Sequence, residues 1–403
     1  MPWTRVVRFG MVSGAGWVLD FLVFSLLIQA GADPSAANAI GASLAVTWVY
    51  VASVRRIFRY GGASLRGRFA AYALFQALGI AIASWAVGVL VLHAGASPLL
   101  AKVMVTPFTF LANYIFMAWL TTTEPPIPHR SQGDRPRILV FVPMFQCERQ
   151  IALVLVRIRE HLSAYVDEVL VVDNGSRDGS REVAAAALAW VGVPGTLLLN
   201  DSNISLGGSH KVAFAYAIAG GFDWVVVVHG DDQAEPADLA PIIAAGALHD
   251  GVDALLGSRF SRGSRRVGYA WHRSCGNRVF NLLFSVVAGR QVADLGSGLN
   301  AFRVGWLRQA TWMKLADDLT FNIHLLLLLV HGRARFCFFP ISWREDGQVS
   351  NVRLIRQAWR TMCIAWGFFW WRGGYLVQDH ARRAPGSYGS STLSENRMKR
   401  ALV

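Results

Sequence analysis

Four apolar segments dominate the N-terminal part of the chain, at residues 7–30, 35–54, 69–93 and 98–120. Each is about 20 residues or longer, which matches the length that a helix needs to cross the hydrocarbon core of a bilayer. The first segment is long and has no small-residue cleavage site, so we do not expect a cleaved signal peptide. The pattern predicts an all-α transmembrane domain of four helices in residues 1–123.

Arginine residues are unevenly distributed over the connections of this region. Arg5 and Arg8 precede the first segment and five more arginines lie between the second and third, whereas the connections near residues 31–34 and 95 carry no Lys or Arg. Because Lys and Arg are enriched in cytoplasmic loops, we expect both ends of the domain in the cytoplasm. The remainder of the chain is then expected there as well.

Residues 136–351 show a different pattern, in which short apolar runs alternate with amphipathic stretches. The runs that predict buried strands are residues 138–142, 168–172, 196–199, 224–228 and 254–256. Such alternation is typical of an α/β domain, a mostly parallel sheet flanked by helices. Residues 124–135, rich in Pro and polar groups, are expected to form a linker before it.

Carboxylates follow the predicted strand at residues 224–228. The next residues are His229, Gly230, Asp231, Asp232 and Gln233. Ligands of open α/β sheets bind at the carboxyl ends of strands, and carboxylate and amide oxygens suit Mg²⁺ or Mn²⁺ carrying a diphosphate. The alternative is a strand that ends in an ordinary acidic surface turn.

Asp173 follows another predicted strand. It could accept a hydrogen bond from a base imide or a ribose hydroxyl, or it could cap the helix that begins near Asp178. Because several strand ends with polar residues converge on one edge, contact with a nucleotide is favoured.

Six motifs in this region resemble, in order, the family 2 glycosyltransferases, and most closely their dolichyl-phosphate mannose synthase and polyprenyl-phosphate glycosyltransferase branch. The motifs are residues 142–148, 172–179, 203–208, 230–236, 257–259 and 294–303. The fold that the resemblance implies is of the GT-A type. The stretch from Arg8 to Asp20, with the four short-looped spans, resembles the GtrA-like membrane proteins linked to polyprenyl-phosphate-sugar handling.

The resemblance also implies roles for individual residues. Asp231 and Gln233 would hold the metal and the diphosphate, Arg259 would meet a phosphate, and Asp294 with Ser297 would lie near the sugar and the reaction centre. Asp231, Arg259, Asp294 and Ser297 form the expected catalytic set. The residues expected around the nucleotide sugar are Pro143, Phe145, Glu148, Asp173, Asn203, Gly207 and Asp231.

Three positions depart from the family pattern. His229 stands where an Asp is usual; a His can bind Mn²⁺ but is a poorer partner for Mg²⁺. Asp232 stands at a commonly apolar position, where it could be a compensating metal ligand or a solvated carboxylate. Ser205 replaces a usual Gly, which alters the loop backbone without obviously abolishing it.

An Arg-rich run, residues 259–266, follows the last predicted strand. The resemblance places the acceptor loop here, so we expect Arg259, Arg273 and Asn277 to bind an acceptor phosphate together with Arg344. The alternative is a solvated basic loop. Residues 343–351 resemble a closing loop of the family, which implies an active-site lid.

The last region, residues 352–403, has two parts. Arg353, Arg356 and Arg360 share one helical face, and the aromatic run at 362–371 is too short to span a bilayer, so residues 352–379 predict an interfacial amphipathic helix. Residues 380–403 are expected to form a disordered basic tail.

The composition favours a membrane protein. Hydrophobic residues make up 53% of the chain and the mean hydropathy is +0.35, which is too apolar for an ordinary soluble protein. The formal net charge of +13 suits nucleic acid or anionic lipid, but no nucleic-acid-binding signature accompanies it, so we expect membrane lipid and no nucleic acid as a partner. The four cysteines lie far apart, which argues against a disulfide framework.

These features together predict an integral-membrane, metal-dependent, inverting glycosyltransferase. It would move a sugar from a nucleotide-diphosphate sugar to a polyprenyl phosphate at the cytoplasmic face. Two alternatives stay open: a glycosyltransferase with another lipid or glycan acceptor, and a catalytically degenerate domain attached to a GtrA-like flippase for lipid-linked sugars. The sequence also leaves a homo-oligomer open.

Overall fold

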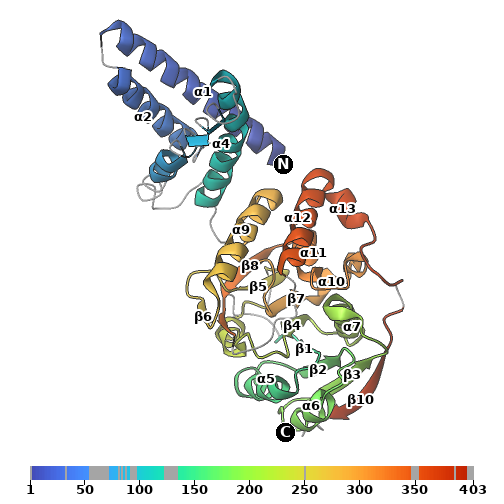
Figure 1. Ribbon diagram of the computed structural model, residues 1–403. Coiled ribbons are helices and arrows are strands. Elements are labelled where there is room, and N and C mark those ends of the chain that lie inside the picture. Colours follow the sequence, from blue (N-terminus) through green and yellow to red (C-terminus); the bar gives the residue numbers. More distant parts are fainter. Residues whose placement is uncertain are drawn as a thin grey trace. The chain divides into compact units, whose positions relative to one another are not determined.

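The chain forms two compact units, Met1–Thr123 with Ser285–Gln291, and Glu124–Phe284 with Val292–Val403 (Figure 1). The computed structural model describes residues 2–31, 34–53, 72–79, 82, 85–86, 89–90, 98–121, 135–248, 251–345, 354–384 and 387–396. Most of the expected linker, the Arg-rich loop between the second and third apolar segments, and residues 346–351 of the expected lid lie outside the described residues.

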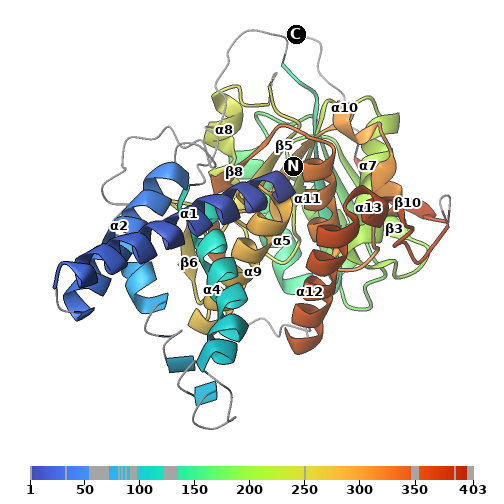
Figure 2. The same cartoon turned by 90° about the horizontal axis from the view of Figure 1, so that it is seen from above.

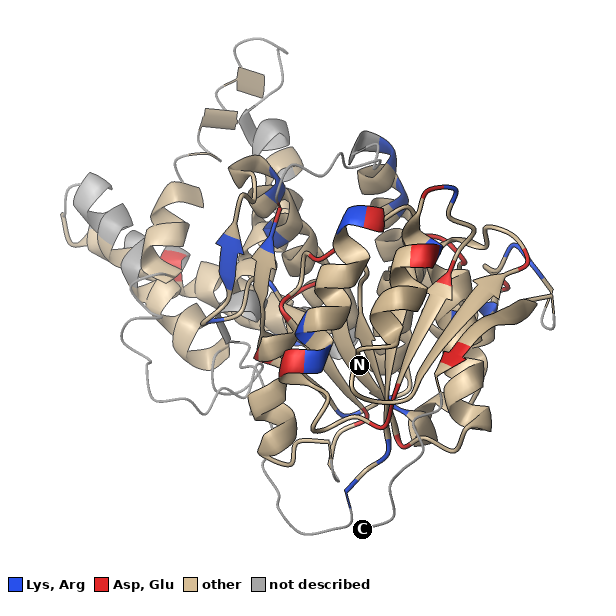
Figure 3. Cartoon of the chain, turned by 90° about the horizontal axis from the view of Figure 1, so that it is seen from below, with Lys and Arg blue, Asp and Glu red and all other residues tan. Residues whose placement is uncertain are grey.

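The first unit contains the helices α1 (Pro2–Gln29), α2 (Pro34–Ala52) and α4 (Pro98–Thr121). These helices carry few charged residues (Figure 3). Aromatic side chains form their core: Phe9 is fully buried, and its ring centroid lies 5.7 Å from that of Tyr114. No helix within the described part of the chain combines the length and the apolarity that crossing a membrane requires.

The second unit is built on an eight-stranded sheet, in the order β10-β3-β2-β1-β4-β7-β5-β8 among the described residues. The strands are β1 (Ile138–Met144), β2 (Glu168–Asp173), β3 (Gly195–Asn200), β4 (Trp224–Val228), β5 (Ala254–Ser258), β7 (Leu299–Arg303), β8 (Phe336–Pro340) and β10 (Ser390–Asn396). Only β7 and β10 run against their neighbours. The predicted mostly parallel α/β sheet is therefore confirmed.

Side chains of β1 alternate between two helical layers. Val140 and Val142 belong to a core formed with α5 (Glu148–His161) and α6 (Ser180–Leu188). Phe141, between them, points to the other face, where its ring centroid lies 5.1 Å from that of His210 on α7 (Ser205–Ala219). The central strand is therefore buried on both sides, which explains its continuous apolar sequence.

Three longer helices lie side by side in this unit (Figure 2). They are α9 (Trp271–Ala288), α11 (Phe321–His331) and α12 (Leu354–Trp371), and α12 is followed by the short α13 (Gly373–Val377). Ile364 and Phe368 of α12 are buried, whereas Trp359, Trp366 and Trp370, which follow one helical stripe, are exposed. Helix α12 is thus amphipathic; Arg353, at the start of its predicted basic face, lies outside the described residues.

The remaining elements are short. They comprise a parallel pair of strands, β6 (Arg265–Val267) and β9 (Ser342–Arg344), the helices α8 (Ala240–Ala244) and α10 (Val304–Leu307), and the 3₁₀ turns Pro236–Asp238 and Thr311–Lys314.

The expectation of a disordered tail after residue 380 is wrong for part of that segment. Residues 390–396 form β10, which pairs antiparallel with β3 from Ser390 opposite Asn200 to Asn396 opposite Gly195. The sequence of the tail shows no alternation of hydrophobic and polar residues that would predict a strand. It is ordered instead by the main-chain donors and acceptors that the edge of β3 offers.

Buried histidines make the second unit sensitive to acid. Burial lowers the pKa of His324 on α11 from 6.5 to about 4, although its ring nitrogen Nδ1 lies 2.9 Å from the carbonyl oxygen of Thr320. As the pH falls from 6.5 towards 4, the unfolded chain binds a proton at this histidine that the folded chain does not bind. The contribution to stability is therefore complete above pH 6.5 and declines towards pH 4.

We predict that His324→Gln reduces the loss of folding stability that accompanies the fall in pH. The free energy of unfolding, measured by urea titration across the same window, should fall less steeply with pH than in the unsubstituted chain, by up to about 1 kcal/mol per pH unit. His161→Gln, at an exposed position of α5, is the control and should keep the original slope. Equal slopes for both variants would contradict the prediction.

Candidate active site

A cavity of about 610 Å³ opens beyond the carboxyl end of β4. Seven of the residues predicted for the site line it: His229, Asp231, Gln233, Arg259, Arg273, Asn277 and Ser297. Apolar side chains complete the wall on the side of α9, α11 and α12, among them Phe280, Ile323 and Ala358. We call this space the central cavity.

Asp231 lies in the turn that ends β4. Its Oδ1 accepts a hydrogen bond from the backbone N–H of Gln233 at 3.2 Å, and burial raises the pKa of the carboxyl group. The turn can approach β1 closely because residue 230 is glycine: a Cβ there would lie 3.0 Å from the carbonyl oxygen of Pro143. The main chain at Pro143 thus packs directly against the acidic turn.

His229, the first residue after β4, lines the same cavity. Its backbone N–H donates to the carbonyl oxygen of Gly298 at 3.0 Å, and a Cβ on Gly298 would lie only 3.0 Å from the imidazole Cγ. Burial, followed by the nearby charge of Arg259, lowers the pKa of His229 to about 4. The imidazole is therefore neutral at pH 7, and its buried Nε2 has no hydrogen-bond partner among the described groups.

This set of donors fits a divalent cation that accepts nitrogen as well as oxygen. One carboxylate, one amide carbonyl and one neutral imidazole come from Asp231, Gln233 and His229, and a lone imidazole nitrogen is a usual ligand of Mn²⁺. Among the residues that the structure describes, no three His, Cys, Asp or Glu side chains gather closely enough to hold an ion by themselves. Oxygens of a bound diphosphate would have to complete the coordination.

Asp232 and Arg344 belong to a separate group of charges. Asp232, with a positive φ of 58°, lies 3.2 Å from Arg157, and Arg157 and Arg344 both pair with Glu235. Neither Asp232 nor Arg344 is among the described residues that line the central cavity. The predictions of Asp232 as a metal ligand and Arg344 as a phosphate ligand therefore find no support, because each charge is already neutralised by a neighbour.

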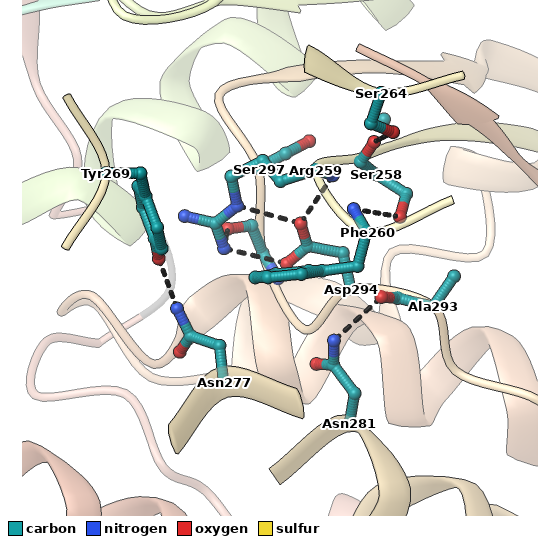
Figure 4. A network of polar contacts seen from close by, with 12 residues as sticks. Ser258, Arg259, Phe260, Ser264, Tyr269, Asn277, Asn281, Ala293, Asp294 and Ser297 are labelled. Carbon is teal, nitrogen blue, oxygen red and sulfur yellow. Dashed lines mark hydrogen bonds and ion pairs between the residues drawn. The ribbon is translucent and has the colours of Figure 1, made fainter. Parts of the chain in front are cut away.

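Arg259 and Asp294 form a forked ion pair at the floor of the cavity (Figure 4). Nε and Nη2 of Arg259 donate to the two carboxylate oxygens at 2.8 and 2.7 Å, and the backbone N–H of Arg259 adds a third bond at 3.0 Å. Burial alone would lower the pKa of Arg259, but the charge of Asp294 raises it above its ordinary value. Nη1 makes no hydrogen bond to the described protein groups, so it is available to an anion.

The ion pair defines the surroundings of Asp294. The carboxylate is 3% exposed and accepts bonds from Arg259 and from the N–H of Gly296, so it holds a cation rather than serving as a free base. Ser297 is likewise engaged: its hydroxyl donates to the carbonyl oxygen of Leu299 at 3.2 Å. Ser297 lines the central cavity, whereas Asp294 supports it through Arg259.

Aromatic rings stabilise the cationic side of the cavity. The guanidinium of Arg259 lies 4.9 Å from the ring centroid of Trp343 and 5.8 Å from that of Tyr269. Tyr269 also stacks with Arg273 at 5.4 Å and accepts a hydrogen bond from Asn277, while Arg273 pairs with Glu345 at 2.8 Å. Tyr269 was not among the residues predicted for the site, and Trp343 was expected only as the first residue of the closing loop; an aromatic residue interleaved with arginines was the available signal.

Apart from Asp231, the residues predicted around the nucleotide lie outside the lining of the central cavity, at the neighbouring strand ends and at the start of α7. Asp173 is fully buried and accepts from Arg181 at 2.6 Å and from the N–H of Ser176 at 3.0 Å. It therefore does not cap α6. Glu148 accepts from the N–H of Gly179 at 3.1 Å, and Phe145 is exposed at the end of β1.

Asparagine side chains join the ends of β2 and β3. Asn174 donates to Asn203 at 2.9 Å and accepts from the N–H of Ile204 and from Asn200. Asn203 in turn accepts from the N–H of Ser205, whose φ is +61°. The left-handed backbone explains why glycine is usual at position 205; here the Asn203 bond supports a serine in that conformation. Asn174 and Asn200 were also missed, although their place at strand ends was visible.

The second unit is an α/β domain with a mostly parallel sheet, and polar groups gather at the carboxyl ends of its strands, where such sheets bind ligands. Residues 139–310 match the family described as glycosyl transferase family 2, and residues 8–122 match the GtrA/DPMS transmembrane domain. The chain is therefore similar in one part to family 2 glycosyltransferases and in another to the GtrA/DPMS transmembrane domain.

Curated relatives match the glycosyltransferase region. The chain is 26% identical over 173 residues to an undecaprenyl-phosphate mannosyltransferase of Micrococcus luteus, covering 43% of this chain and 68% of the relative. It is 24% identical over 167 residues to a polyprenol monophosphomannose synthase of Mycolicibacterium smegmatis, covering 41% and 62%. It thus spans less than two thirds of the second of these relatives.

A solved structure with a related architecture is a mannosyltransferase from Pyrobaculum calidifontis in complex with GDP-Man and Mn²⁺. The two share 18% identity with a TM-score of 0.47, over 66% of this chain and 72% of that one.

We predict that Arg259→Lys lowers the rate of sugar transfer by about 100-fold. Lysine keeps the charge, but it cannot form the planar fork with Asp294 that leaves Nη1 pointing at an anion. The measurement is kcat/KM for transfer, together with the thermal midpoint to confirm folding. Arg262→Lys, at an exposed position of the same Arg-rich run, is the matched control and should leave the rate unchanged. A normal rate in Arg259→Lys would show that the fork is dispensable.

Proposed function

We propose that this chain transfers one sugar from a nucleotide-diphosphate sugar to a polyprenyl phosphate, with inversion at the sugar carbon, and yields a polyprenyl-phosphate sugar. One observation carries the proposal: a single cavity joins the acidic turn of Asp231 to the cation of Arg259 and to an apolar wall from α9, α11 and α12. The names of the two curated relatives, which act on undecaprenyl phosphate and polyprenol phosphate, support the same acceptor class.

The donor end requires stabilisation of a departing diphosphate. Asp231, Gln233 and His229 would hold a divalent cation, Mg²⁺ or Mn²⁺, which would neutralise the charge that grows on the leaving group. The neutral imidazole of His229 favours Mn²⁺ in this pair. The base and ribose would lie along Phe145, Asp173 and the asparagine network at the neighbouring strand ends.

The acceptor end requires an anion site next to an apolar surface. Nη1 of Arg259, with Arg273 and Asn277, would bind the lipid phosphate, while Phe280 and Ile323 would contact the first part of the prenyl chain. A phosphate monoester has a second pKa of about 6, so the acceptor oxygen is mostly ionised at pH 7. No strong general base is required, which agrees with the engagement of Asp294 by Arg259.

The surroundings of the cavity suit a lipid acceptor. The exposed tryptophan stripe of α12 can enter the headgroup region, and the net charge of +13 favours anionic lipid. Arginine placement in the membrane domain supports a cytoplasmic position for the glycosyltransferase domain. A water-insoluble acceptor could then reach the cavity without leaving the membrane.

We predict that the purified full-length chain converts a radiolabelled nucleotide sugar into an organic-extractable product when Mn²⁺ and a polyprenyl phosphate are supplied. Chelation of the metal should abolish the product, and Asp231→Asn should lower the rate by about 100-fold or more, because the carboxylate is lost from the cation site. Glu160→Gln, on the exposed face of α5, is the control. No product from a panel of donors and prenyl phosphates, with a folded chain, would refute the proposal; nucleotide binding without turnover would favour the degenerate domain.

Metal preference gives a separate prediction. His229→Asp supplies a second carboxylate, so the ratio of the rates with Mg²⁺ and Mn²⁺ should shift towards Mg²⁺ by about tenfold. Calorimetry of each metal with the nucleoside diphosphate should show the same shift in affinity. His161→Asp on the surface of α5 should leave the ratio unchanged. An unaltered ratio in His229→Asp would exclude the imidazole from the cation site.

A further inference from the structure

The C-terminal segment holds the loop that leads into α7. This segment, here named the C-terminal strap, comprises residues 381–384 and 387–396. Ser390 pairs with Asn200, the carbonyl oxygen of Gly389 accepts from the N–H of Asp201 at 3.1 Å, and Arg383 donates to the hydroxyl of Ser202 at 2.9 Å. The strap therefore contacts the three residues immediately before Asn203. Figure 1 shows β10 beside β3 at the edge of the sheet.

Hydrogen bonds among Lys211, Asp317 and Tyr388, here called the joint, connect the same strap to α7. Lys211 of α7 is fully buried, and its Nζ donates to the carbonyl oxygen of Leu315 at 2.7 Å, to Oδ1 of Asp317 at 2.7 Å and to the hydroxyl of Tyr388 at 2.9 Å. The hydroxyl of Tyr388 donates in turn to Oδ1 of Asp317 at 2.8 Å, and the other oxygen, Oδ2, accepts from the backbone N–H of Arg382. All three ammonium hydrogens are thus satisfied, which a buried lysine requires.

The joint continues into the start of α7. The carbonyl oxygen of Asp317 accepts from the N–H groups of Gly207 at 2.6 Å and Gly208 at 3.2 Å. The approach is so close that a Cβ on Gly207 would lie 2.5 Å from the carbonyl oxygen of Ala316. Residues 203–207 are consequently held between the asparagine network on one side and the joint of Lys211, Asp317 and Tyr388 on the other.

The strap adds little to the apolar core. Most residues of β10 are exposed, and none of the described strap residues lines the central cavity. Besides the main-chain pairing of β10 along β3, its contacts fall on residues 200–202 and on the joint. The pairing along β3 contributes to the sheet, whereas the contacts with residues 200–202 and with the joint bear on the loop that follows.

We propose that the C-terminal strap is a positioning element for the nucleotide sugar: Tyr388, acting through Asp317 and Lys211, sets the loop Asn203–Gly207 in the geometry that binds the donor. The inference rests on the proposed function, because it takes this loop as part of the donor site. The strap touches neither substrate, so it governs the affinity for the donor and leaves acceptor binding and the chemical step alone.

The test is Tyr388→Phe, which removes the hydroxyl and retains the ring 4.9 Å from Nζ of Lys211. The change removes the hydroxyl's bonds with both Lys211 and Asp317. We expect the KM for the nucleotide sugar to rise about tenfold, with kcat and the KM for polyprenyl phosphate unchanged. Tyr165→Phe, a tyrosine packed against the α5 side of the sheet, is the matched control and should alter none of these values.

Amide hydrogen exchange supplies a readout independent of turnover. Without nucleotide, the amides of residues 203–208 should exchange faster in Tyr388→Phe than in Tyr165→Phe, because the acceptor at Asp317 is less firmly held. If Tyr388→Phe fails to fold, Arg383→Gln replaces it; this variant removes only the bond to Ser202 and should raise the donor KM in the same direction.

The outcomes separate the two proposals. An unsubstituted chain that is inactive on every donor overturns the proposed function. An active chain in which Tyr388→Phe keeps the donor KM and the exchange rates of the control overturns the strap proposal. Equal rises in the donor and acceptor KM values would also overturn it, since a general loosening of the domain would affect both substrates.

Discussion

The forked pair between Arg259 and Asp294 is the interaction on which the site depends. It joins the end of β5 to the turn before β7, two segments that lie far apart in the chain. A buried carboxylate without this cation would carry a large desolvation penalty, and a buried guanidinium without the carboxylate would carry the same. Each charge therefore offsets the desolvation penalty of the other. Nη1 of Arg259 makes no bond within this pair and would be available to a phosphate.

The order of the sheet explains why the polar residues converge. Strands β3, β2, β1 and β4 are parallel neighbours, so their carboxyl ends, with Asn200, Asp173, Met144 and His229, fall on one edge. The antiparallel β7 next to β4 brings the turn with Ser297 and Gly298 back to the same edge. Backbone pairing thereby brings several remote segments of the chain to one edge of the sheet.

Much of this arrangement could be predicted from the sequence. Runs such as Val225–Val228 predict buried strands by their composition, and the motifs after them identified Asp231, Gln233 and Arg259, which do share one cavity. For Asp232 and Arg344 the sequence could not show the ion pairs with Arg157 and Glu235, because a local pattern does not reveal partners from other segments. Strand β10 was missed for a related reason: its order comes from the edge of β3, and its own side chains carry almost no signal.

Strand β10 has a consequence for assembly. An open strand edge invites pairing with a second chain, and β3 would present such an edge if it were uncovered. With β10 in place, a second copy of the protein cannot extend the sheet at β3 without first displacing the strap. The outer edge of β10 is itself a poor partner for another strand, because it is rich in serine, carries Glu395 and has an irregular register between Thr392 and Ser394. The segment that closes over the loop of α7 thus also protects the sheet from aggregation through that edge.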